Sequence, residues 1–74
     1  MVDNAIEWLL VAEYVEKTFE NQLMLGQLYL IKKDYKNAKK KAKKAKKFAG
    51  TRSKLNRVDD LEYSIEIQTE KKWN

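Results

Sequence analysis

The chain of 74 residues has no cysteine, no histidine and no proline, and it has only two glycines. Without cysteine there is no disulfide, and without either residue the Cys/His zinc sites and acid–base catalysis by histidine are excluded. The acids do not form the dense cluster of a calcium loop, so we expect no metal and no other cofactor. The scarcity of proline and glycine leaves little turn chemistry and favours helices.

Long apolar segments are also absent. The longest uncharged apolar run near the N-terminus is "WLLVA", far short of the roughly 20 residues that span a bilayer. The first residues have no basic start before this run and no small-residue cleavage site, so they do not resemble a secretion signal. We therefore expect a cytoplasmic protein with no membrane partner.

Charge is abundant but unevenly placed. The chain carries 16 lysines and arginines against 11 acids, a net charge of +5. Residues 1–31 hold five acids and one base, residues 32–57 hold thirteen bases and one acid, and residues 58–74 hold five acids and two bases. The central segment attracts anions unless the flanking acids fold back and neutralise it.

The apolar pattern predicts one all-α domain over residues 1–74, a small bundle of three or four short helices. A first helix begins near Asp3 or Asn4, either of which can cap it. Its apolar residues lie on more than one side, so we expect Trp8 in the core. A second helix covers residues 22–32 and contains Gly26, a mid-helix glycine that indicates close approach by another backbone.

A third, lysine-rich helix follows a cap at Asp34. Its alanines recur at spacings of four, three and four and define a helical face on which a neighbouring helix can approach closely. They are Ala38, Ala42, Ala45 and Ala49. Gly50 suits the left-handed position just beyond a helix C-terminus.

The last segment admits two interpretations. After a cap at Thr51 or Ser53, Leu61 and Ile65 lie on the apolar side of a helix. The residues around 60–70 also alternate between apolar and polar, as in a strand, but a lone strand would need a second molecule for pairing. We favour the helix. Trp73, near the end of the chain, is expected to be exposed or to contact a partner.

The second and third helices carry a recognisable spacing. Leu25, Gly26 and Tyr29 match the L-G-x-x-Y of tetratricopeptide repeats, and Tyr35 matches the turn aromatic. Ala38 and Ala45 match the small residues of the second helix, whereas Ala42 stands where the family usually has a larger residue. Residues from about 19 to 52 thus resemble one tetratricopeptide-like antiparallel helical hairpin, with Gln22 in place of the opening tryptophan. A weaker resemblance is to three-helix bundles of the microtubule-interacting-and-trafficking type.

The first resemblance implies a non-catalytic module that binds a partner protein, as a small adaptor or regulator. The family's groove is lined by the first helix of each repeat. The contact residues it implies here are Leu23, Gln27, Leu30 and Ile31. Because such arrays need about three repeats for stability, dimerisation or folding onto a partner is expected. The only adjacent carboxylates, Asp59 and Asp60, point about 100° apart on a helix and do not predict an enzyme.

The lysines support an alternative, in which the basic helix of residues 36–47 makes non-specific phosphate contacts with DNA or RNA. An acidic partner protein or a solvated helix face would also explain them. Lysine greatly outnumbers arginine, which argues against base-specific readout, and no aromatic residue interrupts the run to stack on single strands. The predicted contacts are Lys36, Lys39, Lys40, Lys43, Lys44, Lys47, Arg52, Lys54 and Arg57.

Overall fold

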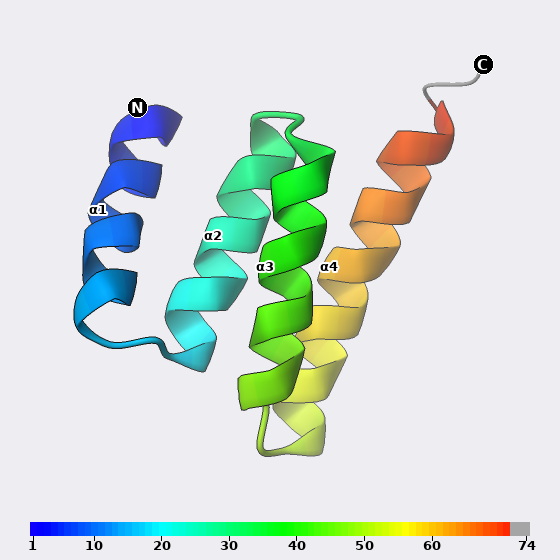
Figure 1. Ribbon diagram of the computed structural model, residues 1–74. Coiled ribbons are helices and arrows are strands. Elements are labelled where there is room, and N and C mark those ends of the chain that lie inside the picture. Colours follow the sequence, from blue (N-terminus) through cyan, green and yellow to red (C-terminus); the bar gives the residue numbers. More distant parts are fainter. Residues whose placement is uncertain (72–74) are drawn as a thin grey trace.

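The computed structural model describes residues 1–71 and contains four helices in chain order (Figure 1). They are α1 (Val2–Val15), α2 (Phe19–Ile31), α3 (Tyr35–Phe48) and α4 (Arg52–Lys71). Consecutive helices run in alternate directions and form a flat array whose Cα atoms extend 40 × 31 × 15 Å. The all-α prediction is confirmed. Residues 60–70 are helical, and the alternative of a strand is wrong. Trp73 lies outside the described residues.

Short polar side chains start three of the helices. Thr18 Oγ1 accepts a hydrogen bond from the backbone N–H of Asn21 at the start of α2, and Asp34 accepts one from Asn37 at the start of α3. Thr51 accepts one from the N–H of Lys54, so it caps α4, whereas Ser53 does not. Each cap satisfies a donor that lacks a partner within its helix. The predicted caps of α1 are wrong, because Met1 holds that position without a side-chain hydrogen bond.

The turn between α2 and α3 closes with a left-handed residue. Lys33 has φ 68°, its N–H donates to the carbonyl of Leu30, and the N–H of Asp34 donates to the carbonyl of Tyr29. These two bonds are the pattern of a Schellman motif, in which glycine is the usual left-handed residue. The left-handed position predicted for Gly50 is wrong, because no glycine of the described chain has positive φ. Ala49 instead ends α3 in an extended conformation.

We expect Lys33→Gly to stabilise the protein by about 0.5–1 kcal/mol. A side chain with a Cβ costs about 1–2 kcal/mol in the left-handed region, and the greater freedom of glycine in the unfolded chain offsets part of that gain. Urea unfolding followed by circular dichroism measures the change. The same substitution at Lys40, in the middle of α3, should instead cost about 1 kcal/mol. A loss of stability in Lys33→Gly would contradict the prediction.

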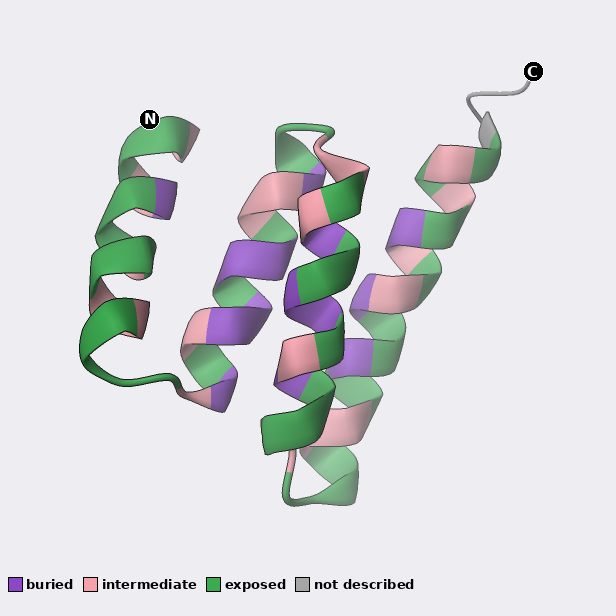
Figure 2. Ribbon diagram, in the orientation of Figure 1, coloured by how far each residue is buried: buried purple, intermediate pink, exposed green. Residues whose placement is uncertain are grey.

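The core lies between α2, α3 and α4, whose buried faces meet (Figure 2). A Cβ built on Gly26 would lie 3.6 Å from both Ala38 O and Ala42 N, on the backbone of α3. The close approach predicted from this glycine is therefore confirmed, and small residues on both helices permit it. The buried cluster contains Phe19, Leu23, Leu30, Ala38, Ala42, Ala45, Val58, Leu61 and Ile65.

Helix α1 lies at the edge of the array and packs along α2, and its Glu13 side chain reaches α3 (Figure 1). Ile6 is its only buried residue. Trp8 is 77% exposed, so its predicted place in the core is wrong, as is the burial of α1 on more than one side. An apolar helix buries both faces only when a second element covers it, and within residues 1–71 none does. No helix of this part of the chain has the length and hydrophobicity needed to cross a bilayer.

Candidate functional site

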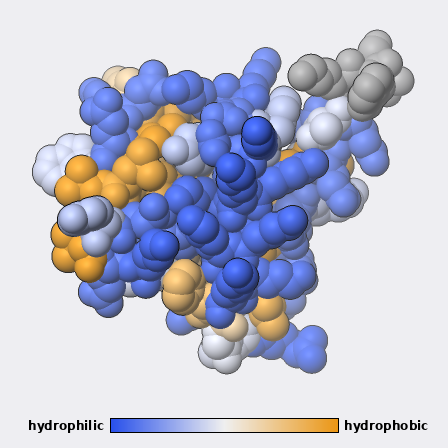
Figure 3. All heavy atoms as spheres, viewed as in Figure 1, coloured by the Kyte–Doolittle hydropathy of each residue, from blue (hydrophilic) through white to orange (hydrophobic). Residues whose placement is uncertain are grey.

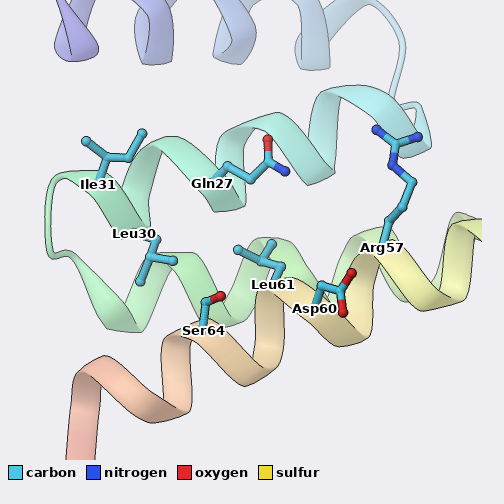
Figure 4. Close-up of a pocket in the computed structure, with 7 residues that line it drawn as sticks. All are labelled: Gln27, Leu30, Ile31, Arg57, Asp60, Leu61 and Ser64. Carbon is cyan, nitrogen blue, oxygen red and sulfur yellow. The ribbon is translucent and has the colours of Figure 1, made fainter. Parts of the chain in front are cut away.

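A shallow groove separates α2 from α4 (Figure 4). It has a volume of about 330 Å³. Three of the four predicted partner contacts line it, namely Gln27, Leu30 and Ile31. The fourth, Leu23, is fully buried in the core, so the structure excludes it from any contact surface of this fold. From α4 the groove receives Arg57, Asp60, Leu61 and Ser64.

The groove offers little apolar surface to a ligand. Leu30 and Leu61, its central apolar residues, are only 8% and 5% exposed because they pack into the core. Ile31 alone is a large apolar side chain open to solvent there. Burial of apolar area drives most association, so the groove is a weak candidate for the main contact.

Two bases of α4 are occupied within the chain. Arg57 donates to both carboxylate oxygens of Glu20, at 3.0 and 3.3 Å. Arg57 and Lys54 also lie 5.4 and 5.5 Å from the centre of the Phe19 ring, within the range of a cation–π interaction. These two predicted phosphate contacts therefore tie α4 to the start of α2. Arg52, at the beginning of α4, is exposed.

The lysines of α3 form a continuous basic surface. Lys36, Lys40, Lys43 and Lys47, here named the lysine ridge, are exposed and recur at spacings of four, three and four. Each of them lies two residues before an alanine of the alanine face. Two residues correspond to a rotation of about 200° around the helix, so the ridge lies nearly opposite that face. Figure 3 shows hydrophilic atoms over α3 and hydrophobic atoms gathered at the left edge, over α1 and α2.

The acids of α1 and α4 leave the lysine ridge without a partner. Among the described side chains, the three ion pairs use Lys32, Lys41 and Arg57. Acids do lie near the ridge: on α4, Glu62 and Glu66 share a hollow of about 360 Å³ with Lys39 and Lys43, and Asp34 precedes Lys36 by two residues. Lys44, the remaining predicted contact, is half-buried on the side of α3 toward Glu13. Folding therefore does not neutralise the basic segment.

One lysine has a different role that the sequence analysis missed. Lys41 is 9% exposed, and its Nζ donates to Glu13 Oε2 at 2.5 Å. Gln22 Nε2 donates to the same oxygen at 2.6 Å, so this polar cluster joins α1, α2 and α3. The signal was in the spacing, because Lys41 is three residues after Ala38 and four before Ala45, on the alanine face. Its partner, 28 residues away, is not visible in the sequence.

Opposing effects act on the carboxyl of Glu13. Burial raises its pKa, but hydrogen bonds from Lys41 and Gln22 and the positive charge of Lys41 outweigh burial, and the pKa lies below its ordinary value. The cluster is incomplete in one respect. Gln22 is fully buried, and its Oε1 has no hydrogen-bond donor. An unpaired buried acceptor costs about 1–3 kcal/mol. The cluster therefore joins three helices but also contains a group that lowers the stability of the fold.

The outer face of α1 is the second feature that the sequence analysis missed. Trp8, Val11 and Val15, here named the α1 strip, follow a spacing of three and four and are 77%, 61% and 80% exposed. Glu7 lies beside Trp8 and Val11 around a hollow of about 300 Å³. The helical spacing was evident in the sequence, but the choice between core and surface depends on which elements pack against α1.

The described residues contain no group of three or more acidic, histidine or cysteine side chains that could hold a metal ion. Comparisons with family models, with curated proteins and with solved structures give no match for this chain. The case for a function therefore depends on the α1 strip, the lysine ridge and the groove.

Proposed function

We propose that the protein is a non-catalytic interaction module that binds an amphipathic helix of a partner protein through the α1 strip. The observation that supports this most is the exposure of Trp8, Val11 and Val15 along one helix. Contiguous exposed apolar side chains are typical of binding surfaces, and tryptophan often dominates their energetics. The strip extends roughly 10 Å, two helical turns, which matches apolar residues at i, i+3 and i+7 of a facing helix.

The charged residues beside the α1 strip indicate which charges the partner helix carries next to its apolar face. Glu7 and Glu16 are exposed near the two ends of the strip, and neither belongs to an ion pair among the described side chains. These carboxylates repel an anionic lipid surface, whereas they attract a helix with lysine or arginine at its edges. A partner protein with an apolar and basic helix therefore fits better than a membrane.

The size of the strip limits the affinity. Burying three large side chains contributes roughly 1.5–3 kcal/mol each, before the cost of association is subtracted. We therefore expect dissociation constants on the order of micromolar. Such a weak contact suits an adaptor or regulator that exchanges partners.

The test is a selection from a phage-displayed library of random 16-residue peptides. Enriched peptides should have apolar residues at helical spacing with basic neighbours. Trp8→Ala should weaken their binding about 30-fold, the effect of losing roughly 2 kcal/mol at a hot spot. Val11→Glu should abolish it, and Tyr63→Glu is the control because Tyr63 is an aromatic residue of α4 with 65% exposure.

Two results would overturn the proposal. One is a set of peptides that bind Val11→Glu as well as they bind the unmodified protein. The other is a dimer in analytical ultracentrifugation that Val11→Glu dissociates, because the strip would then be covered by a second copy.

A further inference from the structure

We propose that the lysine ridge is a second binding surface, separate from the α1 strip, and that it contacts the phosphate backbone of double-stranded nucleic acid without sequence preference. The ridge consists of four exposed lysines on one side of α3, and none of them is paired within the described chain. From Lys36 to Lys47 it spans roughly 16 Å of a straight helix. A duplex presents one phosphate charge per about 1.7 Å of its axis, so four contacts fit within this length.

The composition of the ridge indicates phosphate contacts only. Lysine places a point charge on a flexible stem and lacks the planar fork with which arginine reads guanine. Single-stranded nucleic acids are held largely by stacking on aromatic rings. The aromatic residues of α3 are Tyr35 and Phe48, at its two ends, so no ring of this helix lies between the lysines of the ridge. A duplex therefore fits the ridge better than a single strand.

The opposite face of α3 argues against a lipid surface. A helix that binds in the membrane interface inserts an apolar face among the lipids. Here that face consists of Ala38, Ala42 and Ala45, each fully buried within the protein. The ridge can contact a surface only through its ammonium groups, which is the geometry of backbone binding to a polyanion.

The neighbouring acids weaken the positive potential of the ridge at Lys43. Glu62 and Glu66 lie near Lys39 and Lys43 and weaken the potential toward α4. Lys36, Lys40 and Lys47 are away from that hollow. We therefore expect Lys40 and Lys47 to contribute more to binding than Lys39.

The test is a fluorescence-anisotropy titration of a labelled 20-base-pair DNA duplex at several salt concentrations. With four phosphate contacts, the logarithm of the association constant should fall with the logarithm of salt concentration with a slope of about −3.6. Lys40→Gln/Lys47→Gln should reduce the slope by about 2. The control, Lys17→Gln/Lys33→Gln, removes the same charge from exposed lysines in the α1–α2 and α2–α3 connections and should leave the slope unchanged.

Three outcomes would overturn this proposal: no binding at low salt, an equal effect of the two charge-matched pairs, or tighter binding to anionic vesicles or polyglutamate than to the duplex. Circular dichroism and urea unfolding of each variant establish that it is folded. Val11→Glu should bind the duplex as the unmodified protein does, so failure of the ridge and failure of the α1 strip are distinguished.

Discussion

Lys41→Met should be among the most damaging single substitutions of a charged residue in this protein, with a loss of about 3 kcal/mol in the free energy of unfolding. A chain of this size is stable by roughly 4–11 kcal/mol, so this is a large part of the total. The substitution keeps most of the buried volume but leaves the carboxylate of Glu13 without its cation. Breaking a buried pair costs about 3–5 kcal/mol. The side chains are 11% and 15% exposed, which places the expected loss at the lower end.

Lys40→Met is the matched control for Lys41→Met. Lys40 is the preceding residue of the same helix, but it is exposed and makes no ion pair among the described side chains. Its substitution should change the free energy of unfolding by no more than about 0.5 kcal/mol. Urea unfolding at pH 7 measures both variants. Equal effects at the two positions would show that the polar cluster does not hold α1.

The pH dependence separates loss of the ion pair from loss of packing. Since the folded-state pKa of Glu13 is lowered, its pairing with Lys41 stabilises the protein above the ordinary carboxyl pKa, and this contribution is lost as pH falls through the folded-state value. The deficit of Lys41→Met should therefore be greatest at neutral pH and shrink in acid. A deficit independent of pH would instead indicate a packing defect.

An apolar version of the Glu13–Gln22–Lys41 cluster tests whether the cluster contributes to net stability or to the position of α1. Replacing Glu13 and Gln22 by leucine together with Lys41→Met removes both buried charges and the unpaired Gln22 Oε1. Buried ion pairs can often be exchanged for apolar residues without loss of stability. We expect the triple variant to recover most of the deficit, which would assign the cluster a role in positioning α1 rather than in net stability.

Local chemistry explains which features the sequence predicted. Asp34 and Thr51 cap helices through their own side chains, and Gly26 faces α3 because only a small residue fits there. Features that depend on distant neighbours were missed. Trp8 has the pattern of a core residue, yet no helix of residues 1–71 covers the outer face of α1, and Lys41 is buried because Glu13 meets it from another helix.

The backbone conformations of the turns were likewise not predictable from residue type alone. Glycine tolerates left-handed backbone, but Gly50 is not required to adopt it, whereas the Schellman bonds impose it on Lys33. For the candidate site, exposure could be predicted for the regularly spaced lysines. The burial of Leu23 and the exposure of the α1 strip could not, because amphipathic spacing does not indicate how many helices surround a given one.

Gly26→Leu should destabilise the protein by about 3 kcal/mol or more. The added Cβ alone would lie 2.7 Å from Leu61 Cδ2, and the atoms beyond it have no free space between α2, α3 and α4. Overpacking of a core typically costs about 1–3 kcal/mol, and here the backbone of α3 blocks any easy relief. Leucine is a better helix former than glycine by roughly 1 kcal/mol, so the measured loss understates the steric cost.

Two further substitutions show whether space is the cause. Gln27→Leu introduces the same side chain at the next residue of α2, which is exposed, and should leave stability within about 0.5 kcal/mol. Gly26→Ala meets the α3 backbone only at 3.6 Å, so a shift of the flexible end of Leu61 is sufficient. Its steric cost and its gain in helix propensity nearly cancel. A graded series, with alanine near neutral and leucine disruptive, would show that close contact between α2 and α3 determines the residue at position 26. Equal stability of Gly26→Leu and Gln27→Leu would mean that the two helices can separate at no cost.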